Sequence, residues 1–364
     1  MHDSAVAPDV GVVVARRCEV EAVLRDPEVY SSASQSRLGN GRALRPVELD
    51  PPVHSAWRAA LDPLFAPSRV GDLAQAISGL AAGLIDGFAH ESEIDFAARF
   101  SVPFPALVLM TLLGLPLDDL AWLLDLKDGV IRPNRAIGRP LDDAEVIDYQ
   151  TTMSAAVYEY FGAALDSRED ERTDDLLSRL LDVEIDGRRL SRDLLLDVCF
   201  ALLVEGIAPV SAALDCSFAC LAEHPEVRAA VMANPRQALE ELLRWETPVM
   251  FVERTATKDA VLGGCPISAG QRVLALLGAA NVDPVESPDA GVLRWNREVN
   301  PHLAFGAGIH RCLGSHLARL QLSIALREWH ARISHYSVER SAELAFAPGV
   351  RTVDRFPMQL GRQP

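Results

Sequence analysis

The spacing of apolar residues predicts a mostly helical chain. Apolar positions recur at helical intervals in Leu73–Phe88 and Ala155–Leu165, and much of Val53–Leu190 follows the same pattern. The apolar run Leu194–His224 is typical of a long central helix that is buried on most sides. Further helices are expected over Cys18–Arg25, after Pro225 and over Pro235–Glu246.

A strand-like pattern follows Thr247 and adds a smaller β component. Three segments suit strands and are separated by glycine-containing turns: Phe251–Thr257, Ala260–Leu262 and Arg272–Leu277. Val10–Val14 is a short β-branched run, whereas Ser31–Pro52 and Asn281–Pro301 suit loops. Asp186-Gly187 fits either a hairpin turn or an interhelical turn, and Asp166–Asp175 a solvated connection. The predicted fold class is therefore mostly α with small β-sheets (α+β).

Composition narrows the range of partners. The 364-residue chain is 49% hydrophobic with a formal net charge of -16, which argues against nucleic acid or an anionic membrane as the main partner. We expect a soluble cytoplasmic protein, because no signal peptide is evident and prolines break the apolar stretch Ser101–Leu117. Cys216 and Cys220 could face one metal, but no second ligand pair accompanies them and buried cysteine is often simply apolar.

The segment Phe305–Gly314 combines a cysteine with three glycines ahead of a predicted helix over Ser315–His330. Cys312 is placed at or just before the N-terminus of that helix, where the helix dipole and free N–H groups stabilise a thiolate. Gly306, Gly308 and Gly314 would let the backbone approach something flat and bulky. His310 and Arg311 add hydrogen-bond donors beside the sulfur. The alternative is an incidental cysteine in front of a core helix.

The ten residues 305–314 resemble the haem-ligand loop of the cytochrome P-450 superfamily, F-G-x-G-x-H-x-C-x-G. The resemblance covers roughly residues 10–360. It implies one haem-binding domain over residues 1–364, without the usual first N-terminal helix, and haem b (iron protoporphyrin IX) between the central helix and the loop. By this resemblance, Cys312 would ligate the haem iron, Phe305 would lie against the haem ring, and His310 would hydrogen-bond a propionate.

Other motifs fit the same family. Glu241 and Arg244 match its E-x-x-R motif, and Arg297 matches the later arginine that completes a buried structural triad. Further propionate donors match the motif His54-x-x-x-Arg58 and the strand residue Arg254. Each of these residues alone could equally be an ordinary surface charge or ion pair.

The central helix departs from the family pattern. The family carries an acid and an alcohol where this chain has Ala208 and Pro209, and neither residue can shuttle a proton. Proline inside a helix costs ~3 kcal/mol or more, and it would free the carbonyl of Glu205. Proton delivery could then use the Glu205 carboxyl, a water on that carbonyl, or a polar group of the substrate. Ser211 is a weaker candidate, and Glu205 could instead pair with a cation away from the haem.

The resemblance implies a monooxygenase that oxidises a small organic substrate, with a secondary metabolite as one option. Electrons would come from an external ferredoxin and ferredoxin reductase, because the chain has no flavin or iron–sulfur motif. The resemblance also suggests one set of residues for the substrate pocket and one for docking the electron donor. The pocket set is Leu202, Glu205, Gly206, Pro209, Val249, Met250 and Phe251, and the basic docking set is Arg58, Arg311 and Arg319.

Two alternative functions also use a thiolate-bound haem but do not require ordinary monooxygenation. Both are suggested by Ala208-Pro209 in place of the usual acid and alcohol. The first is unusual chemistry, meaning oxidative coupling, a peroxide-driven reaction or a rearrangement. The second is a non-catalytic haem-containing binding module. For each aliphatic pocket residue the alternative is plain core packing.

Overall fold

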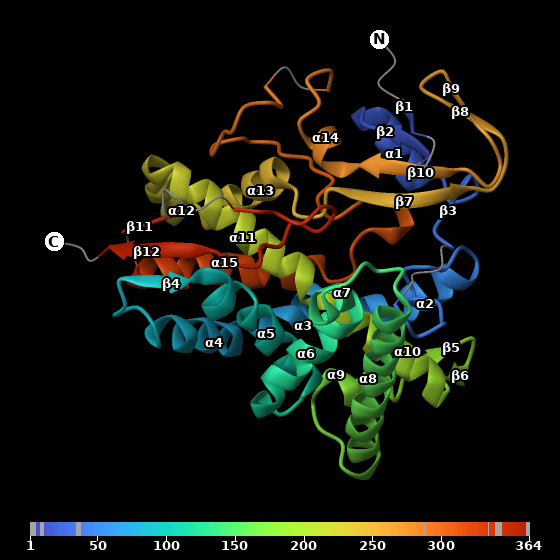
Figure 1. The fold of residues 1–364 in the computed structure, drawn as a ribbon, viewed down its shortest axis with the longest axis horizontal. Helices are drawn as coiled ribbons and strands as arrows, with labels where there is room; N and C mark the ends of the chain where they lie inside the picture. The colour runs from blue at the N-terminus through green and yellow to red at the C-terminus, as the bar shows by residue number, and fades with distance from the viewer. Residues whose placement is uncertain are drawn as a thin grey trace. The chain divides into compact units, whose positions relative to one another are not determined.

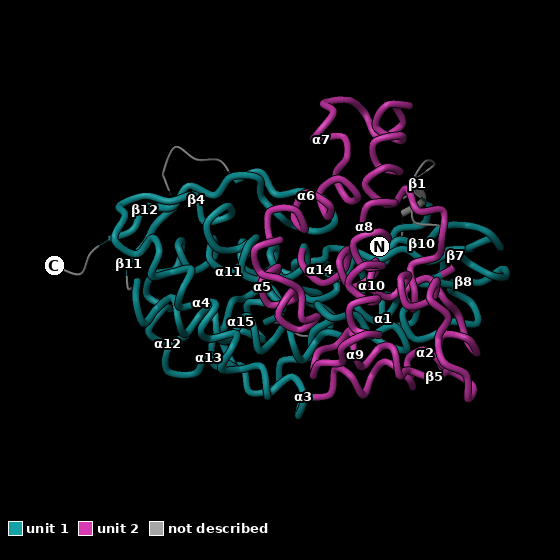
Figure 2. The backbone as a smooth tube through the Cα atoms, turned by 90° about the horizontal axis from the view of Figure 1, so that it is seen from below, with its two compact units in different colours: residues 1–32, 67–104, 208–364 teal, residues 33–66, 105–207 magenta. Residues whose placement is uncertain are grey.

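The structure is a computed structural model that describes residues 5–7, 11–33, 38–286, 289–333, 335–338 and 344–361. The chain forms two compact units. Unit 1 comprises residues 1–32, 67–104 and 208–364, and unit 2 comprises residues 33–66 and 105–207 (Figure 2). Each unit is thus built from separated chain segments. The single domain expected from the sequence stays a prediction.

The elements follow the predicted order along the chain (Figure 1). Those of unit 1 are β1 (Ala5–Ala7), β2 (Gly11–Val14), α1 (Arg17–Arg25), β3 (Tyr30–Ser31), α3 (Pro67–Asp72), α4 (Ala74–Asp86), β4 (Glu93–Asp95), α11 (Ala208–Glu223), α12 (Arg228–Ala233), α13 (Pro235–Glu246), β7 (Phe251–Ala256), β8 (Ala260–Leu262), β9 (Cys265–Ile267), β10 (Arg272–Leu276), α14 (Leu277–Asn281), α15 (Ser315–Arg332), β11 (His335–Val338) and β12 (Pro357–Gly361). Those of unit 2 are α2 (Val53–Leu61), most of α5 (Pro103–Leu113), α6 (Leu120–Ile131), α7 (Pro133–Ile137), α8 (Ala144–Asp170), α9 (Leu176–Leu180), β5 (Glu184–Ile185), β6 (Arg188–Arg189) and α10 (Arg192–Gly206).

The main sheet of unit 1 joins strands from opposite ends of the chain. Its strand order is β1-β2-β10-β7-β3, and β10 pairs parallel with β2 and antiparallel with β7. The register places Val273 opposite Val12 and Ala275 opposite Val14, and all four side chains are buried. The β-branched run near the start of the chain therefore becomes an inner strand that pairs with β1 and β10.

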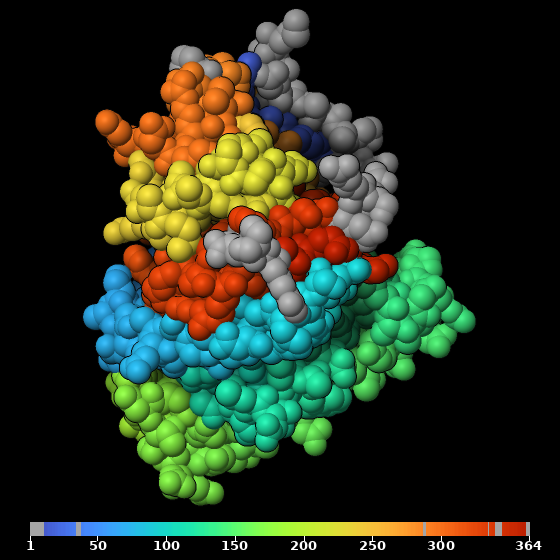
Figure 3. Space-filling model, turned by 90° about the vertical axis from the view of Figure 1, so that its left-hand side faces the viewer, coloured from blue at the N-terminus to red at the C-terminus, as the bar shows by residue number. Residues whose placement is uncertain are grey.

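Aromatic residues form the core beneath the helices of unit 1. Trp329 on α15 lies at its centre, with ring centroids 4.9–5.7 Å from those of Phe88, Phe96, Phe100 and Phe218. α15 packs along α4 and also against α3. Figure 3 shows the two chain segments side by side on one face, residues of α4 in blue and those of α15 in orange-red. Aromatic clusters of this kind contribute strongly to core stability.

Unit 2 is a helical layer in which α8 packs against both α6 and α10. Gly129 on α6 lies so close to α8 that an added Cβ would come within 2.5 Å of Met153, so the residue must be small. The turn between β5 and β6 carries positive φ at Asp186 (53°) and Gly187 (72°). A hairpin turn of this type requires positive φ at both central residues. The open alternative at Asp186-Gly187 is thus a hairpin.

Two sequence predictions were wrong in detail. The expected continuous helix Leu194–His224 is two helices, because the chain breaks at Ile207 between α10 and α11. Pro209 therefore lies in the first turn of α11, where its missing N–H costs little, rather than inside a helix. The expected solvated connection Asp166–Asp175 is also shorter, because α8 continues to Asp170. The buried Asp175 caps α9 by accepting a 2.7 Å hydrogen bond from the Ser178 N–H.

One stretch, residues 192–223, is long and apolar enough by composition to cross a membrane. However, 61% of its most apolar window is buried inside the protein, and the stretch is interrupted at Ile207. Buried core helices have the same composition. The stretch is therefore weak support for a membrane span.

Candidate functional site

The loop that carries Cys312 is closed by its own backbone hydrogen bonds. The Cys312 N–H donates to the Phe305 carbonyl at 2.9 Å, and the Arg311 N–H donates to the Gly308 carbonyl at 3.2 Å. α15 begins at Ser315, so Cys312 lies just before the helix N-terminus, as the sequence predicted. Its side chain is exposed. The loop thus presents one accessible sulfur where the helix dipole favours negative charge.

The glycines of this loop have different roles. Gly306 and Gly308 adopt φ of 67° and 69°, a region that favours glycine. A Cβ on Gly308 would lie 2.2 Å from the Leu24 carbonyl oxygen of α1, so Gly308 lets two backbones meet. By contrast, no heavy atom outside the local chain lies within 4 Å of a Cβ on Gly314. The space beside Cys312 is open at Gly314 and filled by α1 at Gly308.

We expect Gly308→Ala to destabilise the protein by about 1–3 kcal/mol, because the variant combines positive φ with a backbone clash. The denaturation midpoint in urea measures the change. The matched control is Gly291→Ala, an exposed position at which the added methyl group meets nothing within 4 Å. Equal midpoints for the two variants would contradict this account of Gly308.

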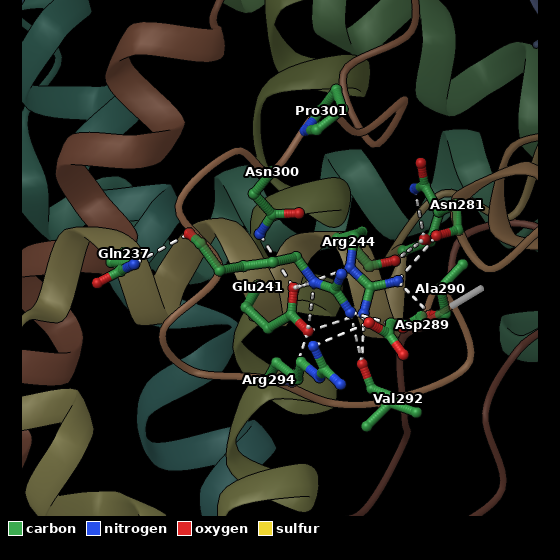
Figure 4. Close-up of polar contacts among 12 residues, drawn as sticks. Gln237, Glu241, Arg244, Asn281, Asp289, Ala290, Val292, Arg294, Asn300 and Pro301 are labelled. Atoms are coloured by element: carbon green, nitrogen blue, oxygen red, sulfur yellow. Dashed lines mark hydrogen bonds and ion pairs between the residues drawn. The ribbon is translucent and has the colours of Figure 1, made fainter. Parts of the chain in front are cut away.

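A buried carboxylate cluster lies between α13 and the chain that leads to the loop (Figure 4). Glu241 is fully buried and accepts hydrogen bonds from Arg244 at 2.7 and 2.8 Å and from Arg297 at 3.2 Å. The Arg294 N–H and the Asn300 side chain also donate to it, at 2.7 and 3.0 Å. Burial opposes ionisation, but the hydrogen bonds and nearby guanidinium charges outweigh it and lower the pKa of Glu241. The three triad residues predicted from the sequence are therefore in direct contact.

The same cluster reaches the cysteine loop through backbone groups. Arg244 donates to the carbonyls of Asn281 and Ala290 at 2.8 and 2.7 Å. The Asn281 side chain in turn accepts a 2.6 Å hydrogen bond from the Leu303 N–H. The Leu303 carbonyl accepts from the Gly306 N–H at 2.8 Å. Disrupting the cluster would therefore loosen the chain on which Cys312 sits.

A second network beside the loop escaped the sequence analysis. Arg319 on α15 donates to Glu240 at 2.6 and 2.9 Å, and His302 contacts the same carboxylate at 2.9 Å. Burial opposes ionisation of Glu240, but these hydrogen bonds and charges prevail and lower its pKa to about 2. The Arg319 guanidinium also lies 4.3 Å from the centroid of the Phe305 ring. The Arg319 charge is thus paired with Glu240, and its role in a docking face stays a prediction.

The other proposed haem contacts are distributed over both units. In unit 2, His54 is buried on α2 and Arg58, one turn later, forms a 2.6 Å ion pair with Asp62. In unit 1, Arg254 lies half-buried on β7 and His310 half-buried in the cysteine loop. These residues are far apart in the sequence. Their role in holding the haem propionates stays a prediction.

Of the expected pocket residues of unit 1, Phe251 begins β7, and Val249 and Met250 lie immediately before it. Val249 pairs with Val350 in an isolated β-bridge, and the Met250 N–H donates to the Gly349 carbonyl at 2.7 Å. A Cβ on Gly349 would lie 3.5 Å from the Phe251 ring. Backbone pairing with the segment around residue 350 therefore fixes where these apolar side chains lie.

The expected pocket residues of unit 2 lie at the end of α10. Leu202 and Gly206 are half-buried, and a Cβ on Gly206 would approach Leu109 of α5 to 3.4 Å. Burial raises the pKa of Glu205, and the charge of Glu48 raises it further. The Glu205 side chain nevertheless has accessible surface. Glu205 is exposed, so water can reach this carboxyl.

The cysteines other than Cys312 show no sign of metal binding. Among the residues that the structure describes, no group of three or more His, Cys, Asp or Glu side chains is placed to hold a metal ion. Cys216 and Cys220 are buried on α11, and burial raises the pKa of the Cys220 thiol to about 12. They fit the apolar alternative considered from the sequence.

Comparison with known proteins points in one direction. A family model described as "Cytochrome P450" matches residues 235–341. The chain is 33% identical to "Probable cytochrome P450 127A1" of Sinorhizobium fredii over 90% of this chain and 78% of that protein. It is 34% identical to "Mycinamicin IV hydroxylase/epoxidase" of Micromonospora griseorubida over 89% and 83% of the two chains. Its structure resembles a cytochrome P450 crystal structure from Bacillus subtilis with TM-score 0.87 and 26% identity, covering 98% and 95% of the two chains.

Proposed function

Because the chain belongs to the cytochrome P450 family, it is a haem-thiolate oxidoreductase of the monooxygenase type with haem b as cofactor, and we propose that Cys312 ligates the iron. The observation that carries this assignment is the closed loop with one accessible sulfur ahead of α15. The donor chemistry and the open space beside Gly314 fit a flat haem group. Bound haem supplies the oxygen-activating chemistry, for which thiolate ligation favours O–O cleavage.

The chain's own residues would hold the cofactor from several elements. His310, Arg254, His54 and Arg58 supply hydrogen-bond donors or positive charge for the propionates. Phe305 would contact the ring, with its position fixed by Arg319 at 4.3 Å from its ring centroid. The buried Glu241 cluster supports the chain before the loop and acts on structure rather than on the reaction.

We propose that the substrate is a small or medium-sized organic molecule of secondary metabolism. Two relatives carry names that specify such chemistry, "Mycinamicin IV hydroxylase/epoxidase" and "Nocardicin C N-oxygenase". Leu202, Val249, Met250 and Phe251 would give the pocket the apolar lining that such ligands require. The reaction would take place in the cytoplasm without a membrane partner.

Electrons would come from an external ferredoxin and its reductase. Arg311 is exposed beside Cys312 and is a candidate for contact with an acidic electron donor. Arg58 and Arg319, which form ion pairs with Asp62 and Glu240, are further candidates for this face.

The reaction type has a second candidate. Ala208 and Pro209 replace the usual acid and alcohol, which favours oxidative coupling, a peroxide-driven reaction or a rearrangement as alternatives to ordinary monooxygenation. If the reaction is ordinary monooxygenation, Glu205 at the end of α10 would supply the proton. Pro209, in the first turn of α11, has no N–H that could donate to the Glu205 carbonyl.

We expect the purified protein, supplied with haem, reduced and exposed to carbon monoxide, to give the Soret band of a thiolate-ligated haem. Substrate conversion that requires a ferredoxin system would support monooxygenation. Conversion that needs only hydrogen peroxide, or no oxidant, would support the second candidate. A folded protein that binds no haem would overturn the whole assignment.

A further inference from the structure

Glu240 on α13 binds two side chains that lie next to the cysteine loop. The Arg319 guanidinium of α15 donates to both carboxylate oxygens, at 2.6 and 2.9 Å. His302 Nε2 lies 2.9 Å from Glu240 Oε2. Two parallel hydrogen bonds between a guanidinium and a carboxylate fix both distance and direction, so Arg319 is held in one orientation.

The proton of His302 can be assigned from a backbone contact. His302 Nδ1 accepts the Ala304 N–H at 3.2 Å, so Nδ1 carries no proton and Nε2 carries one. His302 therefore donates to Glu240 as a neutral ring, and its side chain is 3% exposed. The cluster consequently contains one negative carboxylate and one positive guanidinium.

Both donors to Glu240 also lie against the Phe305 ring. The Arg319 guanidinium is 4.3 Å from the Phe305 ring centroid, which is a cation–π contact. The centroid of the His302 ring is 6.0 Å from the same centroid, and the two rings are tilted by 44°. The Phe305 carbonyl accepts the Cys312 N–H at 2.9 Å. Phe305 therefore connects the Glu240 cluster to Cys312.

The charge of Arg319 is compensated by a single carboxylate. Among the residues that the structure describes, Glu240 is the only acidic partner of Arg319. The next residue on α13, Glu241, pairs instead with Arg244 and Arg297. Replacing Glu240 would therefore leave the Arg319 charge uncompensated beside Phe305.

We propose that Glu240 is a positioning residue that sets the reduction potential of the iron bound to Cys312, because it compensates the Arg319 charge and holds that guanidinium on Phe305. This inference rests on the proposed function, which supplies the thiolate-bound iron. Reduction adds one negative charge at the metal, so a nearby uncompensated cation favours the reduced form. The same cation would withdraw electron density from the sulfur and weaken its donation to the iron. Glu240 thus keeps the potential low and the thiolate a strong donor.

The electron balance involves no chemistry on the cluster itself. In the step that depends on this potential, the external donor loses one electron and the iron changes from ferric to ferrous. No proton leaves Glu240, His302 or Arg319, and no covalent bond forms or breaks among them. The three side chains act through charge and position alone.

The first test measures the midpoint potential of haem-loaded variants by spectroelectrochemical titration. Glu240→Gln should raise the potential by about 59 mV, a tenfold change in the ratio of ferrous to ferric iron, because Arg319 loses its compensating charge. Arg319→Gln should lower the potential by a similar amount, because the carboxylate is then uncompensated. In the double variant the two charge changes cancel, so the ratio should return to within about twofold of the unsubstituted protein. Glu240→Asp keeps the charge and should also stay within about twofold.

Donation by the thiolate provides the second readout. The stretching frequency of carbon monoxide on the ferrous haem rises when the sulfur donates less electron density to the iron. The frequency should therefore rise in Glu240→Gln and fall in Arg319→Gln. A loss of packing alone would shift both variants in the same direction.

The matched control is Glu328→Gln, on the same helix as Arg319. The Glu328 carboxylate pairs with Arg332 at 2.7 Å, and its side chain is 14% exposed compared with 23% for Glu240. Glu328 lies 328 - 315 = 13 residues beyond the start of α15, or about 20 Å along the helix. Charges at that distance are largely screened by salt, so both readouts should stay unchanged.

Potentials that shift in the same direction in both single variants would overturn the inference and leave Glu240 as a structural link between α13 and α15. Urea midpoints of the same preparations show which variants are folded. If Glu240→Gln does not fold, Arg319→Gln decides, because a lower potential supports the inference and an unchanged or higher one overturns it. An unsubstituted protein without a thiolate-haem spectrum would overturn the proposed function and this inference with it. An intact spectrum with unmoved potentials would overturn this inference alone.

Discussion

Glu241→Ala is expected to lower the free energy of unfolding by about 3–5 kcal/mol, because it removes the only acidic partner shared by two arginines in a buried cluster of the described structure. Arg244 is 3% exposed and would keep its charge without the carboxylate that compensates it. Urea denaturation followed by circular dichroism measures the loss. Haem retention should fall as well, since the cluster is linked to the cysteine loop through Asn281 and Leu303.

The control for this prediction is Glu226→Ala. Glu226 pairs with His224 in an exposed ion pair, so its loss should cost less than about 1 kcal/mol. Similar losses in both variants would contradict the buried-cluster account.

The lowered pKa of Glu241 also fixes the sign of the pH effect. A carboxyl whose pKa is lower in the folded state contributes stability above its unfolded pKa and loses it as pH falls through the folded value. The difference in stability between Glu241→Ala and the unsubstituted protein should therefore shrink on acidification. A difference that grows toward low pH would contradict the assigned charge state of Glu241.

Cys312→Ser should abolish the thiolate-type carbon monoxide spectrum and reduce oxidation by about 100-fold or more, because a serine hydroxyl does not supply an anionic sulfur ligand. The fold should survive, since Cys312 is exposed and its N–H contact to Phe305 is made by the backbone. The spectrum, product formation and urea midpoint are measured on the same preparation.

Cys18→Ser is the matched control, because Cys18 is also an exposed cysteine of unit 1. It should leave the spectrum and product formation unchanged. A thiolate-type spectrum that persists in Cys312→Ser would transfer the ligand role to another residue.

Local patterns explain why much of the fold was predictable. The spacing between Glu241 and Arg244 places them on one helix face, and the glycine positions around Cys312 restrict the loop. These features depend on residues close in sequence. The positions of strands and helices could be predicted for the same reason, because they depend on local spacing. At Asp186-Gly187 the sequence allowed either a hairpin turn or an interhelical turn, and the structure has the hairpin.

Long-range partners could not be predicted in the same way. Arg319 meets Glu240 at a sequence separation of 79, and Arg45 meets Asp197 across a still longer stretch. No local pattern encodes such pairs, because they depend on how helices pack. The break at Ile207 was missed because apolar periodicity continues through it, although Pro209 was the available signal.

The parallel pairing of β2 with β10 has a consequence for biosynthesis. Val12 lies opposite Val273, so the two positions are separated by 273 - 12 = 261 residues. At a synthesis rate of about 5–20 residues per second, β2 emerges from the ribosome roughly 13–50 seconds before its parallel partner exists. During that interval the nascent chain carries a valine-rich strand with an unfilled edge, which is a template for aggregation. Heat-shock chaperones that bind short apolar segments should therefore engage this chain early, and slower translation would lengthen its dependence on them.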